Sequence, residues 1–319
     1  MLASIVAIVA GLAALLWSAE RFVASASALA ARFGVPPLLI GMLVIGFGTS
    51  APEMTVSVIS AATGNPGIAL GNAFGSNIAN IALVLGLTAI VRPVRVHSGV
   101  LRSELPLLIG ATVLAGALLL DGILARGDAA VLLAVFAGLL GWSLWTARRH
   151  PGDALAGDVE RELPAAAGGA GRDATWLLFA LAVLIGSSRL LVWGAADLAA
   201  RAGMDDLLIG LTIVAIGTSL PELASSIAAA RRGEHELAFG NVLGSNLFNT
   251  LVVVGLAGAV APAAVSPDLI SRDLPMASAL TVALLLLGWG GRGPGRISRL
   301  EGVLLTIAFV AYMAVLATG

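Results

Sequence analysis

Two glutamates lie within stretches of sequence that otherwise avoid charge, and their chemistry needs explaining first. Glu53 and Glu222 are 169 positions apart, and each directly follows a proline, Pro52 or Pro221. A charged side chain at the centre of a lipid bilayer costs about 2.5–3.5 kcal/mol on insertion scales, so such residues usually serve a function. A buried carboxylate can bind a cation or a proton, and two carboxylates together neutralise one divalent ion.

Each proline also changes the helix around its glutamate. The ring removes a backbone hydrogen bond and leaves the carbonyl oxygens one turn earlier without their usual donor. Hydroxyl side chains stand beside both prolines in the sequence, namely Thr49, Ser50, Thr218 and Ser219. The pattern therefore predicts that carboxylate, hydroxyl and backbone oxygens point to one place.

A second stretch follows each glutamate and carries a polar stripe. Asn72, Ser76 and Asn80 are spaced at i, i+4 and i+8, which places them on one face of a helix. The same spacing recurs in the later copy, at Asn241, Ser245 and Asn249. Stripes of Asn and Ser alone often serve only helix packing. Beside two carboxylates, we interpret them as further ligands.

The predicted ligand set consists of hard oxygen atoms, and this limits the ion. Calcium takes six to eight oxygen ligands, and sodium is a hard ion of similar size. The chain has no Cys, and its three histidines, His97, His150 and His235, fall in predicted loops. Zinc, copper and nickel therefore fit poorly. Calcium, sodium and protons all remain open as occupants of the carboxylates.

The elements that must position these residues are membrane helices. The chain has 319 residues, of which 58% are hydrophobic and 12% charged, whereas soluble domains have roughly 45–50% and 25%. Apolar runs near the length of a membrane-spanning helix lie at about 2–18, 35–63, 67–91, 104–125, 129–147, 174–196, 206–230, 237–262, 274–290 and 300–318. We predict an all-α membrane protein with ten transmembrane helices. A net charge of −1 gives no reason to expect a nucleic-acid partner.

Arginine distribution predicts the orientation in the membrane. Residues 1–17 contain no basic residue, so the first run lacks the charged start of a signal peptide, and we expect it to stay as a span. With the N-terminus outside, fourteen arginines fall on the cytoplasmic side. The other side has four, namely Arg126, Arg189, Arg201 and Arg272. This positive-inside bias predicts that both termini lie outside.

The chain also contains an internal repeat. Residues 30–86 align with 199–255 without a gap, and the shared residues are mostly polar or small. Five predicted spans separate equivalent positions, so the two copies face opposite ways. Inverted repeats with interrupted helices are typical of secondary transporters. We predict one five-helix repeat over residues 1–147, a cytoplasmic linker over 148–173 and an inverted second repeat over 174–319.

At these residues the sequence resembles the calcium/cation antiporter superfamily, in particular prokaryotic sodium/calcium exchanger-like proteins. The stretches GFGTSAPEMTVS…GNAFGSNIAN (46–80) and AIGTSLPELASS…GNVLGSNLFN (215–249) are similar to the two signature repeats of that family. The resemblance implies two inverted five-helix repeats. It also implies alternating access, in which the first and sixth helices slide past the others.

The resemblance further implies a set of ion ligands. These are the carboxylates of Glu53 and Glu222, the hydroxyls of Thr49, Ser50, Thr218 and Ser219, the side chains of Ser76, Asn80, Ser245 and Asn249, and the backbone oxygens of Gly46 and Ala215. Some family members, notably potassium-dependent ones, carry Asp at the position of Asn249. Asn249 thus argues against potassium co-transport.

From the residues and the resemblance together we expect an antiporter that exchanges sodium for calcium, with no cofactor beyond the transported ions. We expect it to work as a monomer in the lipid bilayer of a prokaryotic inner membrane. Proton/calcium exchange on the same site is the alternative, because buried glutamates protonate readily. A cation channel would need a continuous polar pathway. An enzyme has no support, since no predicted span pairs a nucleophile with a histidine.

Overall fold

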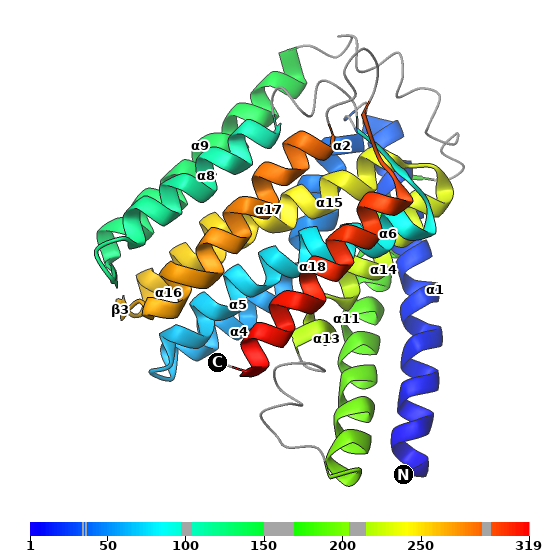
Figure 1. Cartoon of the computed structure of the whole chain (residues 1–319). Coiled ribbons are helices and arrows are strands. Elements are labelled where there is room, and N and C mark those ends of the chain that lie inside the picture. The colour runs from blue at the N-terminus through cyan, green and yellow to red at the C-terminus, as the bar shows by residue number, and fades with distance from the viewer. Residues whose placement is uncertain are drawn as a thin grey trace.

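The protein is a bundle of membrane-length helices, seen in a computed structural model that describes residues 1–33, 35, 37–96, 104–149, 169–203, 215–288 and 295–318 (Figure 1). The first part of the bundle comprises α1 (Leu2–Phe33), α2 (Pro37–Ile40), the π-helix η1 (Gly41–Gly46), α3 (Phe47–Thr49), α4 (Ala51–Ala62), α5 (Pro66–Ile78), the π-helix η2 (Ala79–Leu85), α6 (Gly86–Val91), β1 (Val94–Val96), α8 (Glu104–Leu119), β2 (Ile123–Leu124) and α9 (Arg126–Arg149).

The second part follows nearly the same order. It comprises α11 (Ala170–Arg201), α13 (Ala215–Thr218), α14 (Leu220–Arg232), α15 (His235–Leu247), the π-helix η4 (Phe248–Val253), α16 (Val254–Val260), β3 (Ala263–Ala264), the π-helix η5 (Leu269–Asp273), α17 (Leu274–Leu287), β4 (Gly295–Ile297) and α18 (Arg299–Thr318). Helices α5 and α15 begin and end 169 residues apart, as the sequence repeat requires.

Seven helices in the described part of the chain are long and apolar enough to cross a membrane. The count is eight if Pro37–Thr49 and Ala51–Ala62 form one span bent by 46°. The predicted span at 104–125 is the shorter helix α8. Of the one at 206–230, residues 206–214 lie outside the described residues. The all-helical membrane class is therefore confirmed.

Several predicted boundaries were wrong. Helix α1 continues fifteen residues beyond the predicted end at 18, because no Gly or Pro occurs between residue 18 and Gly34. Helix α11 begins at Ala170, inside the predicted linker. Most of that linker, residues 150–168, lies outside the described residues. His235 was expected in a loop but is the first residue of α15 and is buried.

The two longest helices, α1 and α11, lie side by side (Figure 1). Small residues bring their backbones close: a Cβ on Gly194 would meet the carbonyl oxygen of Ser4 at 2.7 Å. Polar contacts join both ends of the pair. Ser4 donates a hydrogen bond to Asp197 at one end, and Arg32 forms an ion pair with Asp173, 3.4 Å apart, at the other.

Two short antiparallel ladders, which the sequence did not predict, join loops from the two halves. Strand β1 pairs with β4, and β2 pairs with β3. The ladders lie at opposite ends of the bundle (Figure 1). Near the first ladder, Arg92 donates a hydrogen bond of 2.6 Å to the carbonyl oxygen of Arg231. Loops with many arginines thus meet at one end of the molecule.

The main core lies where the two halves meet. Large side chains of α5 and α15, such as Phe74 and Phe239, are almost completely buried there among residues of η1, η2, η4, α8 and α17. A second cluster, centred on Phe22 of α1, packs α1 and α11 against α14 and η1. The polar stripes of α5 and α15 therefore belong to elements held firmly by apolar contacts on their other faces.

Candidate ion-binding site

The helix breaks predicted at the two prolines exist, and they follow the same geometry. Ser50 has φ −83° and ψ 0° and separates α3 from α4. Ser219, its counterpart, has φ −89° and ψ 5° and separates α13 from α14. Each proline then occupies the first turn of the new helix, where its missing N–H does no harm. Both glutamates consequently lie in the first turn of a helix, where the helix dipole favours negative charge.

The two carboxylates are the most buried charged groups of the described chain. Glu53 and Glu222 each have 1% of their surface exposed. Glu222 receives a 3.4 Å hydrogen bond from the Ser50 hydroxyl, which comes from the other half of the chain. Neither oxygen of Glu53 has a partner among the described residues, nor does Oε2 of Glu222.

Further hydrogen bonds cross between the two halves around these carboxylates. The Thr49 hydroxyl donates to Oδ1 of Asn241 at 3.2 Å. The Ser245 hydroxyl donates to the carbonyl oxygen of Gly46 at 3.4 Å. Residues predicted from both copies of the repeat therefore meet at one place, as the sequence pattern required.

An asparagine from the neighbouring helix holds the backbone of each glutamate. Asn72 donates from its amide to the carbonyl oxygen of Glu53 at 3.2 Å and to the Ser57 hydroxyl at 3.1 Å. Asn241 repeats this for the carbonyl oxygen of Glu222 at 3.1 Å and the Ser226 hydroxyl at 2.8 Å. The first residue of each polar stripe thus positions the glutamate through its backbone.

Beyond the carboxylates, a set of amides crosses the interface at the π-helices. Asn80, in η2, donates to Oδ1 of Asn246 at 3.2 Å. Asn77 donates to the Thr250 hydroxyl at 2.8 Å. Asn249, in η4, is fully buried, and neither its nitrogen nor its oxygen has a partner among the described residues. Short π-helical stretches are common at functional sites.

Sequence reasoning did not identify Asn77, Asn246 and Thr250 as residues of this region. Asn77 and Asn246 match across the repeat and are small polar residues in apolar helices, so the repeat itself contained the signal. The π-helices have no comparable sequence signal.

For the remaining predicted ligands the structure gives the position on a helix but few contacts. Ser76 is buried on α5, and Ser219 is buried with its hydroxyl lacking a described partner. Thr218, at the end of α13, is half-buried. Ala215 is the first residue of α13, and its side chain lies outside the described part of the structure.

A tight backbone contact closes one side of the site. A Cβ on Gly240 would meet the carbonyl oxygen of Leu38 at 2.6 Å, and one on Gly244 would meet that of Met42 at 2.3 Å. Glycine is therefore required at both positions for η1 and α15 to approach this closely. The contact places the Gly46 carbonyl beside Ser245.

The buried side-chain oxygen atoms that lack a described partner are all hard ligands. They include both oxygens of Glu53, one of Glu222, the hydroxyl of Ser219 and the side-chain oxygens of Asn80 and Asn249. Buried polar atoms are normally paired, and an unpaired one costs free energy. A hard cation would satisfy several of these oxygens at once. The arrangement therefore fits sodium or calcium, since the amide nitrogens of Asn246 and Asn249, which also lack a described partner, are donors and cannot bind a metal ion.

Comparison with known proteins identifies the family. Residues 3–145 and 173–318 match the family described as sodium/calcium exchanger protein. The chain belongs to this family. It is thus a membrane transporter of the cation/calcium antiporter type, not an enzyme.

Individual relatives span nearly the whole chain. The inner membrane protein YrbG of Escherichia coli is 42% identical over 322 residues, covering 99% of this chain and 97% of its own. The sodium/calcium exchanger MaX1 of Methanosarcina acetivorans is 28% identical over 342 residues, with 96% of each chain covered. The solved structure of the sodium-calcium exchanger NCX_Mj, soaked without sodium or calcium, superposes with a TM-score of 0.84 at 28% identity, covering 98% of this chain and 99% of that one.

Proposed function

We propose that the protein exchanges sodium for calcium by alternating access, with Glu53 and Glu222 shared by the two ions. The observation that carries this proposal is the pair of buried carboxylates between the two halves, three of whose four oxygens have no partner among the described residues. The names of MaX1 and NCX_Mj, both sodium/calcium exchangers, support the same pair of ions.

Sharing of the carboxylates explains why transport would be an exchange. Two unpaired carboxylates in a buried site repel one another, and burial of unpaired charge is expensive. The protein would therefore change conformation readily when cations neutralise the pair and rarely when the site is unoccupied. One calcium or a set of sodium ions meets this condition, so after one ion has left on one side, another must bind before the site can return.

The proposed ligand set extends beyond the carboxylates. It comprises the side chains of Thr49, Ser50, Thr218, Ser219, Ser76, Asn80, Ser245 and Asn249 and the backbone oxygens of Gly46 and Ala215. Support is strongest for Ser219 and Asn249, whose buried polar atoms lack other partners in the described chain. Asn72 and Asn241 would act on the ions only by positioning the two glutamates.

We further propose ten spans in two inverted five-helix repeats, over residues 1–147 and 174–319, with the linker 148–173 in the cytoplasm and both termini outside. The two ladders support this topology, because each joins loops that the arginine distribution assigns to one side. The start of α1 and the end of α18 both lie along the lower edge of the bundle in Figure 1. The name of YrbG supports an inner membrane location.

The coupling ion can be tested with the purified protein in liposomes. We expect calcium uptake into vesicles loaded with sodium, and none into matched vesicles that contain choline and a proton gradient. Uptake driven by the proton gradient alone would contradict sodium coupling and assign the site to proton/calcium exchange. Uptake that needs no counter-ion would contradict antiport altogether.

Variants of the carboxylates test the site. Glu53→Ala and Glu222→Ala should each lower sodium-dependent calcium uptake at least about 100-fold, because each leaves the other carboxylate without its partner in binding a divalent ion. Glu20→Gln is a matched control, since Glu20 is an exposed carboxylate of α1. Normal exchange in both alanine variants would refute the proposed site.

A further inference from the structure

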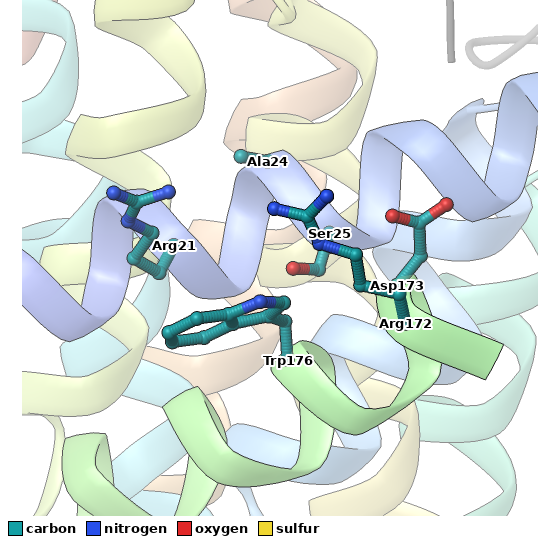
Figure 2. Close-up of a pocket in the computed structure, with 6 residues that line it drawn as sticks. All are labelled: Arg21, Ala24, Ser25, Arg172, Asp173 and Trp176. Atoms are coloured by element: carbon teal, nitrogen blue, oxygen red, sulfur yellow. The ribbon is translucent and has the colours of Figure 1, made fainter. Parts of the chain in front are cut away.

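A second polar pocket lies between α1 and α11, and ion exchange gives no reason for it. Its volume is about 150 Å³. Figure 2 shows the residues that line it, namely Arg21, Ala24, Ser25, Arg172, Asp173 and Trp176. The pocket thus combines two guanidinium groups, one carboxylate, one hydroxyl and one indole ring. None of these residues belongs to the proposed ion site.

The pocket has an excess of positive charge. The carboxylate of Asp173 forms an ion pair with Arg32, which does not line the pocket. No acidic residue in the described part of the chain forms an ion pair with Arg21 or Arg172. The guanidinium carbon of Arg21 lies 5.6 Å from the centre of the Trp176 ring, and this contact leaves its N–H donors available to a ligand. In Figure 2, Arg172 stands between Arg21 and the Asp173 carboxylate.

Aromatic residues place the pocket at a membrane–water boundary. Trp176 and Trp193 are 17 residues apart on α11, which is about 26 Å along a helix and close to the roughly 30 Å thickness of the hydrocarbon core. Tryptophan is enriched at both boundaries of a bilayer. On α1, the exposed large apolar residues extend from Leu2 to Trp17, apart from Phe33 at the end of the helix, and Arg21 follows Trp17 one turn later. The pocket therefore lies where the apolar surface ends, on the arginine-rich side.

An aromatic surface adjoins the pocket on its membrane side. The rings of Trp17, Trp176 and Phe179 pack edge to face, with centroids 5.7 to 6.4 Å apart. Trp17 is 42% exposed and Phe179 is 51% exposed. A ligand with an anionic head and apolar chains would match both parts of this surface at once.

We propose that this pocket binds the phosphate of an anionic phospholipid from the leaflet on the arginine-rich side. Arginine binds phosphate through paired N–H donors, and basic pockets between membrane helices on the cytoplasmic side are typical sites for anionic headgroups. A free phosphate ion shares the headgroup chemistry. The aromatic surface favours the lipid, because only a lipid has chains that can cover it.

Native mass spectrometry of the full-length protein can measure the binding. Phosphatidylglycerol is titrated against phosphatidylcholine, for the unchanged protein and for Arg21→Gln/Arg172→Gln. We expect the double variant to raise the dissociation constant of the first phosphatidylglycerol on the order of 20-fold, without a change for phosphatidylcholine. The control is Arg296→Gln/Arg299→Gln, which removes the same charge from exposed positions on the same predicted side.

Several outcomes would overturn the proposal. One is an equal loss of phosphatidylglycerol binding in both double variants, since a general charge effect would then explain the preference. Another is full displacement of the lipid by inorganic phosphate, which would identify a soluble ligand. If the double variant does not fold, Arg172→Gln alone should weaken binding about fivefold, and an unchanged constant refutes the site. The measurement needs no ion gradient, so its result is independent of the proposed exchange.

Discussion

Helices α15 and α5 occupy equivalent places in the two halves, yet their first turns differ in burial. Every residue of α15, from His235 to Leu247, is buried. The matching part of α5 exposes Gly67, Ile68 and Gly71. These turns lead to the same carboxylates from opposite ends of the molecule. The start of α15, on the arginine-rich side, is therefore enclosed, whereas the start of α5, on the other side, is partly exposed.

The burial of α15 has a described cause in its packing. Gly240 and Gly244 of α15 are in backbone contact with α2 and η1. A Cβ added to either of the equivalent residues of α5, Gly71 or Gly75, would meet no described atom within 4 Å. The counterparts of most of α2 and η1, residues 206–214, lie outside the described residues, so the described difference between the two copies is one of exposure. Alternating access requires a difference in exposure between the copies, because exchanging it moves the opening from one side to the other.

The most sensitive test of the difference between α15 and α5 adds one methyl group to each helix. Gly244→Ala places a Cβ 2.3 Å from the Met42 carbonyl oxygen, so η1 and α15 must separate. We expect a loss of about 3 kcal/mol or more in stability and loss of calcium uptake. Gly75→Ala should change stability by less than about 1 kcal/mol, in the stabilising direction, because alanine favours a helix. Thermal unfolding in detergent without sodium or calcium measures both.

Equal destabilisation by the two substitutions would contradict the difference in exposure between α5 and α15. It would mean that α5 is packed as closely as α15 in the conformation that the protein adopts in solution.

The asparagines that hold the glutamates provide a second, smaller test. Asn241 is 1% exposed, donates two hydrogen bonds and accepts one from Thr49. Asn72 donates the equivalent two bonds but is only half-buried, so water can replace it. We expect Asn241→Ala to cost about 2–3 kcal/mol and Asn72→Ala about 1 kcal/mol. Chemical denaturation with matched calcium-uptake assays would show this order, and a reversed order would contradict the difference in burial.

Much of this comparison could be predicted from the sequence, because duplication repeats each chemical feature twice. The prolines predicted the breaks at Ser50 and Ser219, and the repeat predicted that residues from both copies would meet. Helical spacing predicted one polar face for Asn72, Ser76 and Asn80, and the structure places the first two on α5 and Asn80 in η2. In a bilayer each helix must pair its own backbone groups, so membrane helices could be predicted from local composition.

The differences between the copies could not be predicted, because the residues concerned are the same in both. Asn80 donates to Asn246, whereas its counterpart Asn249 has no described partner. Nothing in the sequence distinguishes them; the conformation does. The positioning role of Asn72 and Asn241 was also missed, since spacing identifies a face of a helix but not the atom it contacts. The π-helices and the two ladders depend on tertiary packing, which spacing does not describe.

The smallest expected effect separates a structural hydroxyl from an ion ligand. Ser50 donates to Glu222, whereas the hydroxyl of its counterpart Ser219 is buried without a described partner. Ser50→Ala should lower stability by about 0.5–1.5 kcal/mol with or without ions, because it removes a hydrogen bond within the protein. Ser219→Ala should leave the ion-free protein unchanged. It should instead reduce the rise in unfolding temperature that calcium causes, since a ligand stabilises the folded state in proportion to its affinity. Loss of stability in ion-free Ser219→Ala would show that the hydroxyl has a partner in the protein, and the two halves would then be more alike than their contacts indicate.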